Sequence, residues 1–186
     1  MVLSAPQSET LLWRLTEVSL SWQGGVRLEG IDLEIPAGVT AIMGYSGAGK
    51  TSLLNVLVGF ERPDRGDIQR NQTHSETATL DLFWVPHSLG LWPQYTVREH
   101  CLLVSPDPDQ QQARVDELLA AFVLTEVSDK YPGQLSQGEA SRLSVVRALA
   151  SQAKVLVMDE PLVHVDQAHW PQYWDFIRAY CASHSI

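Results

Sequence analysis

The chain has 186 residues, 45% of them hydrophobic, and a formal net charge of −9. This length suits one domain with a core of its own, and the negative charge argues against a broad nucleic-acid surface or an electrostatic membrane anchor. No apolar run approaches the ~20 residues of a membrane-spanning helix, so we expect any membrane role to require another chain.

The N-terminus and the cysteines indicate the compartment. Residues 1–10 contain no basic residue and no apolar core, which predicts a loose leader rather than a signal peptide. Cys101 and Cys181 lack the spacing of a metal site. Two cysteines without such spacing favour a reduced, cytosolic setting.

The first part of the chain alternates apolar and polar residues, as half-buried strands do. Val18, Leu20 and Trp22 share one face of the first alternating run. We expect strands over residues 13–22, 26–35 and 39–43, a helix over residues 52–58, a turn over residues 61–67 and an exposed polar segment over residues 69–78.

The second part of the chain is predicted to be mainly helical. Thr96 and Ser136 each precede a glutamate by three positions, Glu99 and Glu139, which is the spacing of a capping box. The β-branched run at residues 154–158 predicts a fully buried parallel strand. We expect a further strand over residues 79–86 and helices over residues 96–104, 110–123, 136–151 and 167–182.

A glycine-rich segment between the strand at 39–43 and the helix at 52–58 fits G-x-x-x-x-G-K-[ST], the phosphate-binding P-loop. Its glycines let backbone N–H groups approach phosphate oxygens, and the helix start adds a positive dipole end. Lys50 supplies a mobile charge, and the Thr51 hydroxyl can ligate Mg²⁺. The alternative is a chance turn before a core helix. The predicted phosphate-binding set is Gly44, Tyr45, Ser46, Gly47, Ala48, Gly49, Lys50, Thr51 and Ser52.

Two carboxylates follow the apolar strand at residues 154–158, as in a Walker B motif. Asp159 is predicted to reach Mg²⁺ through water, and Glu160 to polarise the attacking water as a general base. Two solvated acids at a strand end are the alternative, which a P-loop upstream makes less attractive.

Residues 131–139, followed by Arg142 and residues 147–149, are similar to the signature helix of the nucleotide-binding subunits of ATP-binding cassette (ABC) transporters. The resemblance covers residues 13–186 in the family's order: P-loop, helical insert, signature and Walker B. Gln137 and Glu139 depart from the usual Leu-Ser-Gly-Gly-Gln signature.

The resemblance implies an α/β P-loop NTPase fold with a mostly parallel sheet flanked by helices and an N-terminal antiparallel β part. It implies a single nucleotide-binding domain over residues 1–186, with a helical subdomain at about 88–150. Ser136 and Gly138 open a helix and so provide a second anion site. In this family that site, with Gln137 and Glu139 beside it, caps the γ-phosphate bound to a second subunit arranged head to tail.

The function implied by the resemblance is ATP binding and hydrolysis that powers solute transport through a separate transmembrane permease. The implied cofactors are ATP and Mg²⁺, and the implied assembly is a homodimer or heterodimer of cassettes at the cytoplasmic face of the membrane, without nucleic acid. Residues 91–99 look most like importer subunits of the molybdate or metal-ion kind. A hydrolysis-poor regulatory or degenerate subunit and a soluble non-transport ABC ATPase remain as alternatives.

Three further positions take their roles from the resemblance. Asp166 stands at the anchoring acid of the D-loop. Trp22 stands near the aromatic residue that stacks on adenine, although its phase with Val18 and Leu20 also allows a core position. His87 replaces a glutamine that touches the metal and the attacking water; Gln94 is a weaker substitute, and a simple surface bend is the other alternative.

The family's last strand and its switch histidine should follow beyond Ile186, so we expect that segment to be missing from this chain. His184 falls too early for that role and is predicted to lie in the turn after the last helix. The remaining histidines lack convergent ligand spacing, which predicts solvated or satisfied side chains rather than a metal site; they are His74, His100, His164 and His169.

Overall fold

The computed structural model describes residues 2–4, 11–23, 25–71, 80–184 and 186. The chain divides into two compact units, Met1–Thr73 and His74–Ile186. The predictions for residues 5–10, 72–78 and Thr79, and the one for His74, lie outside the described residues.

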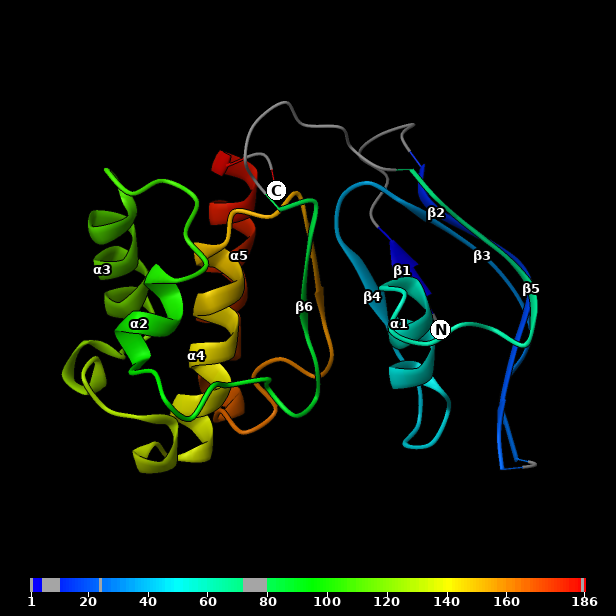
Figure 1. Ribbon diagram of the computed structural model, residues 1–186, viewed down its shortest axis with the longest axis horizontal. Coiled ribbons are helices and arrows are strands. Elements are labelled where there is room, and N and C mark those ends of the chain that lie inside the picture. The colour runs from blue at the N-terminus through cyan, green and yellow to red at the C-terminus, as the bar shows by residue number, and fades with distance from the viewer. Residues whose placement is uncertain (1, 5–10, 24, 72–79, 185) are drawn as a thin grey trace. The chain divides into compact units, whose positions relative to one another are not determined.

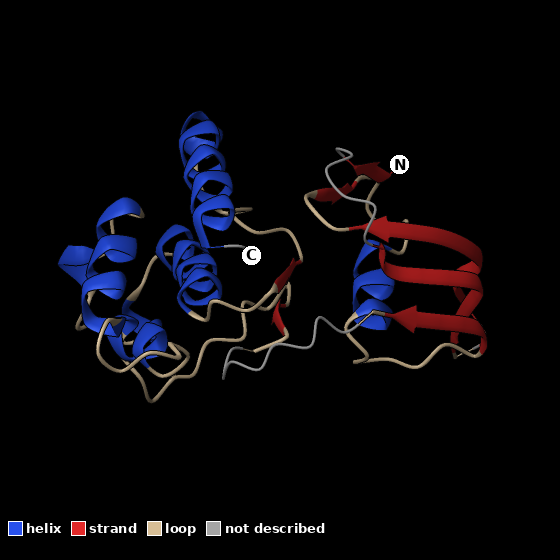
Figure 2. Ribbon diagram, turned by 90° about the horizontal axis from the view of Figure 1, so that it is seen from above, coloured by secondary structure: helices blue, strands red, loops and turns tan. Residues whose placement is uncertain are grey.

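The first unit is built on a three-stranded antiparallel sheet in the order β3-β2-β5. Helix α1 packs against this sheet (Figure 2), and the Trp13 indole nitrogen donates to the carbonyl of Leu57 at the helix end, at 3.0 Å. The elements are β1 (Val2–Ser4), β2 (Leu11–Trp22), β3 (Gly25–Pro36), β4 (Thr40–Ile42), α1 (Lys50–Leu57) and β5 (Arg65–Arg70).

Two sequence predictions in this unit are wrong because strand pairing is not visible in local sequence. Val2–Ser4, predicted as part of a leader, form β1 and pair antiparallel with β4. Residues 65–67, predicted as a turn, begin β5 on the free edge of β2. Gly66, the second residue of β5, has a left-handed φ of 86°, and a Cβ at this position would lie 2.5 Å from the carbonyl oxygens of Thr16 and Glu17. Glycine therefore lets a polar segment approach the bulged part of β2.

Trp22 is 65% exposed, whereas Val18 and Leu20 are buried. The pairing of β2 with β3 shifts register between Val18 and Leu20 and again between Leu20 and Ser21. Each shift breaks the two-residue alternation of sides. The alternative that Trp22 belongs to the core is therefore wrong.

The second unit surrounds helix α4, which contacts α2, α3, α5 and strand β6 (Figure 1). Its apolar core gathers side chains from all four helices. The elements are β6 (Leu82–Val85), α2 (Val97–Leu102), α3 (Gln111–Ala121), α4 (Gln137–Ala150), β7 (Val155–Met158) and α5 (Trp170–His184), with 3-10 turns over Thr125–Val127, Pro132–Gln134 and Gln167–His169.

Both predicted capping boxes are confirmed. The Thr96 side chain accepts from the Glu99 backbone and Glu99 reaches back to Thr96, and Ser136 and Glu139 make the same exchange at the start of α4. These contacts depend on residues three positions apart, so a local pattern suffices to find them.

Strand β7 pairs parallel with β6, as predicted. The expectation of full burial is wrong, because only Val157 is buried and the other strand residues are half-buried. Among the described strands, β7 pairs only with β6, so its second edge has no hydrogen-bonded strand. His184 is not in a turn: it ends α5, and its ring stacks on Tyr180 with a centroid distance of 4.0 Å.

Among the described residues, no helix combines the length and the apolar character that a membrane crossing requires. Cys101 and Cys181 are free thiols. Burial raises the pKa of Cys101 to about 12, so this thiol is unreactive near neutral pH.

Candidate functional site

The P-loop follows β4 and ends where α1 begins at Lys50. Gly47 and Gly49 have φ of 79° and 86°, which side-chain-bearing residues rarely adopt. A Cβ on Gly49 would lie 2.6 Å from the carbonyl oxygen of Arg27 in β3. Only glycine therefore lets the loop pass this close to β3 and turn into the helix.

The start of α1 is open to an anion. Its N-cap is Gly49, which offers no side-chain hydrogen bond, and its first turn contains no acidic residue. The Lys50 ammonium lies over the loop and donates to the carbonyl oxygens of Gly44 at 3.1 Å and Tyr45 at 3.2 Å. Helix N–H groups, a positive dipole end and a lysine thus converge where phosphate oxygens would bind.

A charged network behind α1 was not found from sequence. Arg27 donates through Nε to Ser52 Oγ at 2.9 Å and through both terminal nitrogens to Glu61, at 2.5 and 3.0 Å. Asn55 adds a bond to the same carboxylate at 2.7 Å. The Arg27 hydrogen bond is the main cause that lowers the pKa of Glu61. The Ser52 hydroxyl, which accepts from Arg27, thus ties α1 to β3, and a role of Ser52 toward phosphate stays a prediction.

The Walker B carboxylates lie at the end of β7 in the second unit. The Asp159 backbone N–H donates to Val85 of β6 at 2.9 Å, and the residue is only 3% exposed. Glu160, the next residue, has a left-handed φ of 49°, and its side chain is 44% exposed. The backbone thus fixes one carboxylate inward and turns the other toward solvent.

His87 and Glu160 lie close together. His87 Nδ1 is 3.5 Å from Glu160 Oε2. The two residues follow β6 and β7, and the carboxyl ends of parallel strands meet at the same sheet edge. The structure thus joins two residues predicted separately. Both side chains are exposed, so this pair contributes little stability, and its interest is that an imidazole faces the predicted base.

The start of α4 carries the signature. Ser136 donates to Glu139 Oε2 through its backbone N–H at 2.7 Å and through its hydroxyl at 2.8 Å. These bonds, the backbone one first, lower the pKa of Glu139. A Cβ on Gly138 would lie 3.1 Å from the carbonyl oxygen of His164, so the helix start packs against the segment after the Walker B strand.

Asp166 is placed as a capping residue. Its carboxylate accepts from the backbone N–H of Ala168 at 2.9 Å, and the Trp170 indole donates to Val165 at 3.0 Å. Gln137 and Trp22 are exposed. The roles of Asp166, Gln137 and Trp22 toward nucleotide stay predictions.

The residues predicted to hold Mg²⁺ are Thr51, through its hydroxyl, and Asp159, whose carboxylate is predicted to reach the ion through water; the first belongs to the first unit and the second to the second. Hydroxyl and carboxylate oxygens are the donors that this hard cation prefers, so the residues fit the ion chemically. Among the described residues, no group of three or more histidine, cysteine, aspartate or glutamate side chains could hold a metal by itself.

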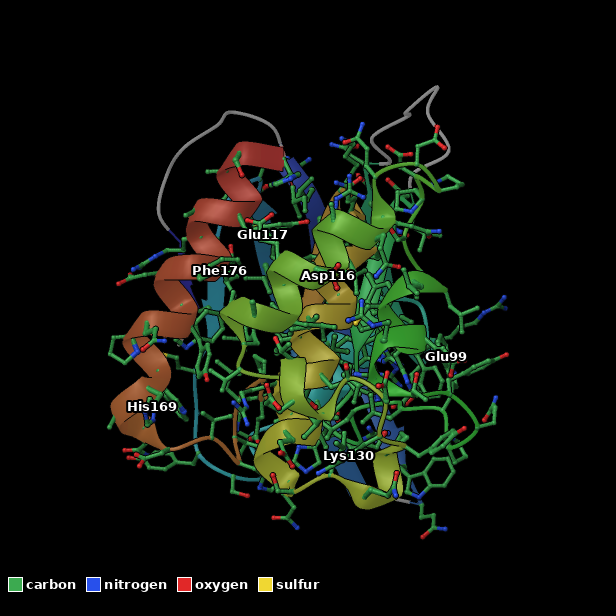
Figure 3. All side chains as sticks on the ribbon, turned by 90° about the vertical axis from the view of Figure 1, so that its left-hand side faces the viewer. Glu99, Asp116, Glu117, Lys130, His169 and Phe176 are labelled. Carbon is green, nitrogen blue, oxygen red and sulfur yellow. The ribbon has the colours of Figure 1, made fainter. Side chains whose placement is uncertain are left out.

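The remaining described histidines match the prediction of solvated or satisfied side chains. His100 is buried: its Nε2 accepts from the Trp92 backbone at 2.8 Å, so the proton lies on Nδ1, which donates to Thr96 at 2.7 Å. Burial lowers the pKa of His100, which is therefore neutral. His164 and His169 are exposed, and Figure 3 shows His169 at the start of α5.

A family model described as ABC transporter matches residues 28–163. The chain belongs to the ABC transporter family. The matched range includes the P-loop, the signature and the Walker B motif, so the predicted family is confirmed. Trp22 and Asp166 fall outside it.

Curated members of the ABC transporter family agree with this assignment. The chain is 34% identical over 160 residues to the sulfate/thiosulfate import ATP-binding protein CysA of Synechocystis sp., covering 82% of this chain and 45% of that protein. It is 38% identical over 144 residues to the spermidine/putrescine import ATP-binding protein PotA of Chromobacterium violaceum, covering 73% and 40%. The chain thus spans less than half the length of these two relatives.

Solved ABC structures share the fold. An ATP-binding subunit of an ABC transporter superposes with a TM-score of 0.73 at 19% identity, covering 92% of this chain and 75% of that chain. A dimeric post-hydrolysis ATP-binding cassette bound to ADP and Pi gives 0.71 at 19% identity, covering 89% and 81%. The predicted α/β P-loop fold is therefore confirmed.

Proposed function

We propose that this chain binds and hydrolyses ATP and thereby powers solute import through a separate membrane subunit. The observation that carries the proposal is the start of α1, where Gly49 leaves the helix without a side-chain cap and Lys50 lies over the loop. The two relatives named above are import ATP-binding proteins, which supports the transport role.

In this proposal Lys50 and the backbone N–H groups of residues 47–52 bind the phosphates of ATP. Thr51 and Asp159 would hold Mg²⁺, which supplies positive charge to the phosphate oxygens when bound. Glu160 accepts a proton from the attacking water as the general base, and His87, 3.5 Å away, orients that water or the carboxylate.

The second anion site, at Ser136 and Gly138, would serve the ATP of another cassette. Its helix start is exposed at Ser136 and Gln137, so it is open to a partner. We propose a head-to-tail dimer that closes on two ATP molecules and opens after hydrolysis, driving a permease from the cytoplasmic membrane face. The dimeric cassette among the fold neighbours supports this arrangement.

Three further assignments complete the proposal. The exposed ring of Trp22 stacks on the adenine base. Asp166 anchors the segment between the Walker B strand and α5. The chain forms a single nucleotide-binding domain, with residues of about 88–150 as its helical subdomain.

One alternative has an observation in its favour. His87 stands where the family has glutamine, and a neutral imidazole offers water one acceptor nitrogen where a glutamine amide oxygen offers two lone pairs. A hydrolysis-poor, regulatory subunit would bind ATP in the same P-loop but turn it over slowly.

Steady-state Mg-ATPase of the chain, measured beside Lys50→Ala and Glu160→Gln, tests the proposal. Turnover that both substitutions abolish supports hydrolysis in this site. ATP binding that needs Lys50, without turnover, would identify the hydrolysis-poor alternative. Absence of ATP binding by the unsubstituted chain would contradict both.

A further inference from the structure

Arg147 is a buried cation in the middle of the second unit. It belongs to α4 and is 3% exposed. Its Nη1 donates to the carbonyl oxygen of Gly90 at 2.5 Å, and its Nη2 donates to that of Leu89 at 2.9 Å. No carboxylate of the described residues forms an ion pair with it, and its Nε has no hydrogen-bond partner there.

Two aromatic rings complete the surroundings of this guanidinium. Its carbon lies 4.9 Å from the ring centre of Trp92 and 5.5 Å from that of Phe83. Phe83 belongs to β6, and Trp92 ends the bend at residues 88–92 that follows this strand. Arg147 therefore contacts the strand before the bend as well as the middle and the end of the bend, and the two rings stabilise its charge.

The bend itself has an uncommon backbone. Leu89 and Gly90 both have left-handed φ, at 65° and 60°, and the Leu89 N–H closes a turn onto Pro86 at 2.8 Å. A left-handed leucine is strained and persists only where its surroundings hold it. Here the two consecutive carbonyls are held by one planar guanidinium, whose fork matches them in a way that a lysine ammonium cannot.

The bend begins directly after His87. At its far end, the Trp92 backbone donates to His100 of α2, and the two rings stack at 5.4 Å. At its near end, the Arg147 fork and the turn from Leu89 to Pro86 fix where the chain leaves β6. His87 and its 3.5 Å approach to Glu160 therefore depend on the stretch that Arg147 holds.

We propose that Arg147 is a positioning residue for the hydrolysis reaction. Its fork holds the bend at residues 88–92 so that His87 stays beside Glu160. Because Arg147 lies on the helix that begins at the signature, a shift of α4 reaches His87 through this guanidinium. The inference rests on the proposed ATPase function.

A first experiment compares Arg147→Lys with Arg98→Lys. The first substitution keeps the charge and removes the fork. The second removes a fork from α2 that pairs with Asp116 and does not touch the bend. We expect Arg147→Lys to lower kcat about tenfold with KM for Mg-ATP within about twofold, as loss of an alignment does. Arg98→Lys should leave both constants within about twofold.

A double substitution separates positioning from general damage. If Arg147 acts through His87, Arg147→Lys should lower kcat by less than about twofold once His87→Ala is present, because the group it positions is gone. Two independent, multiplicative losses of kcat would overturn the positioning role.

Amide hydrogen exchange gives a readout that does not depend on activity. Exchange across residues 88–92 should quicken in Arg147→Lys and not in Arg98→Lys, while thermal unfolding shows that both variants are folded. If Arg147→Lys does not fold, Gly90→Ala replaces it: its Cβ would lie 3.4 Å from Arg147 Nη2 at a left-handed φ. The same quickening and loss of kcat are expected.

Unchanged exchange together with unchanged kcat in these variants overturns the inference. Failure of the proposed function looks different: the unsubstituted chain then shows no turnover. In that case faster amide exchange across residues 88–92 in Arg147→Lys would still support the claim that Arg147 fixes the backbone of this bend. Unchanged exchange would refute that claim.

Discussion

Helices α1 and α4 each begin at a predicted phosphate site, yet the two starts are built differently. Helix α1 begins after Gly49 without a side-chain cap. Helix α4 begins after Ser136 with a complete capping box to Glu139. A phosphate can therefore serve as the cap that α1 lacks, whereas at α4 it meets a helix start that its own residues already satisfy.

The two starts also differ in how they are anchored. Behind α1, Arg27 of β3 binds Ser52 and Glu61, so the helix is fixed by a residue far away in sequence. At α4 the anchoring residues, Ser136 and Glu139, lie three positions apart. The Glu139 carboxylate that accepts from Ser136 is itself part of the predicted phosphate site. The comparison indicates that α1 is preorganised for an anion, whereas α4 needs a partner that competes with Glu139.

The largest effect is expected at the open helix start. Lys50→Ala removes the cation over the loop and should weaken ATP binding by at least about 100-fold, the scale of a lost charge-assisted phosphate contact. Equilibrium binding of a fluorescent ATP analogue measures it. Lys154→Ala, which removes a lysine outside the loop, is the control. Equal affinity in the two variants would show that α1 does not bind the phosphates.

The next largest effect concerns the close approach of the loop to β3. Gly49→Ala places a Cβ 2.6 Å from a backbone oxygen at a left-handed φ, and should destabilise the chain by about 2–3 kcal/mol. Gly59→Ala is a matched control, because Gly59 has φ 77° but nothing within 4 Å of the added Cβ. Urea unfolding should show a smaller loss for Gly59→Ala, and equal losses would mean that the contact with Arg27 is unimportant.

Removing the side-chain cap of α4 should destabilise the chain less than Gly49→Ala does. Ser136→Ala deletes the hydroxyl that accepts from Glu139 and should lower the free energy of unfolding by about 1 kcal/mol. Ser183→Ala is a suitable comparison, since that hydroxyl bonds only within the last turn of α5. A loss no larger than that of Ser183→Ala would show that the capping box contributes little.

The smallest effect is a pH dependence of the free energy of unfolding, to which a glutamate near each of the two helices contributes. The pKa of Glu61 and of Glu139 is lowered in the folded chain, by Arg27 and by Ser136 respectively. The stability they contribute is present above their ordinary pKa of 4.5 and is lost as pH falls through the lower folded values. Glu61→Gln and Glu139→Gln should each flatten the fall in stability below about pH 4.5, measured by urea unfolding across pH.

Sequence predicts the parts of this molecule that depend on neighbouring residues. The P-loop, both capping boxes and the strand before Asp159 are local patterns, and the structure has them where expected. The pairing of Val2–Ser4 with β4 and the exposure of Trp22 depend on strand register, which local alternation does not encode.

The contacts that hold the site were the least predictable. Arg27 reaches Ser52 across 25 positions, and Arg147 reaches Gly90 across 57. The residues that neighbour each arginine in the sequence give no indication of which distant residue it contacts. The approach of His87 to Glu160 likewise needed the parallel pairing of β6 with β7.

The most direct test of the difference between the two helix starts is ATP-dependent dimerisation of the Glu160→Gln chain, followed by analytical ultracentrifugation. If α1 binds ATP in its own chain and α4 caps it in another, the mass should double with Mg-ATP. Adding Gly138→Asp should leave ATP binding intact and the chain monomeric. A Glu160→Gln chain that binds ATP and stays monomeric, or a Gly138→Asp chain that dimerises equally well, would contradict the account.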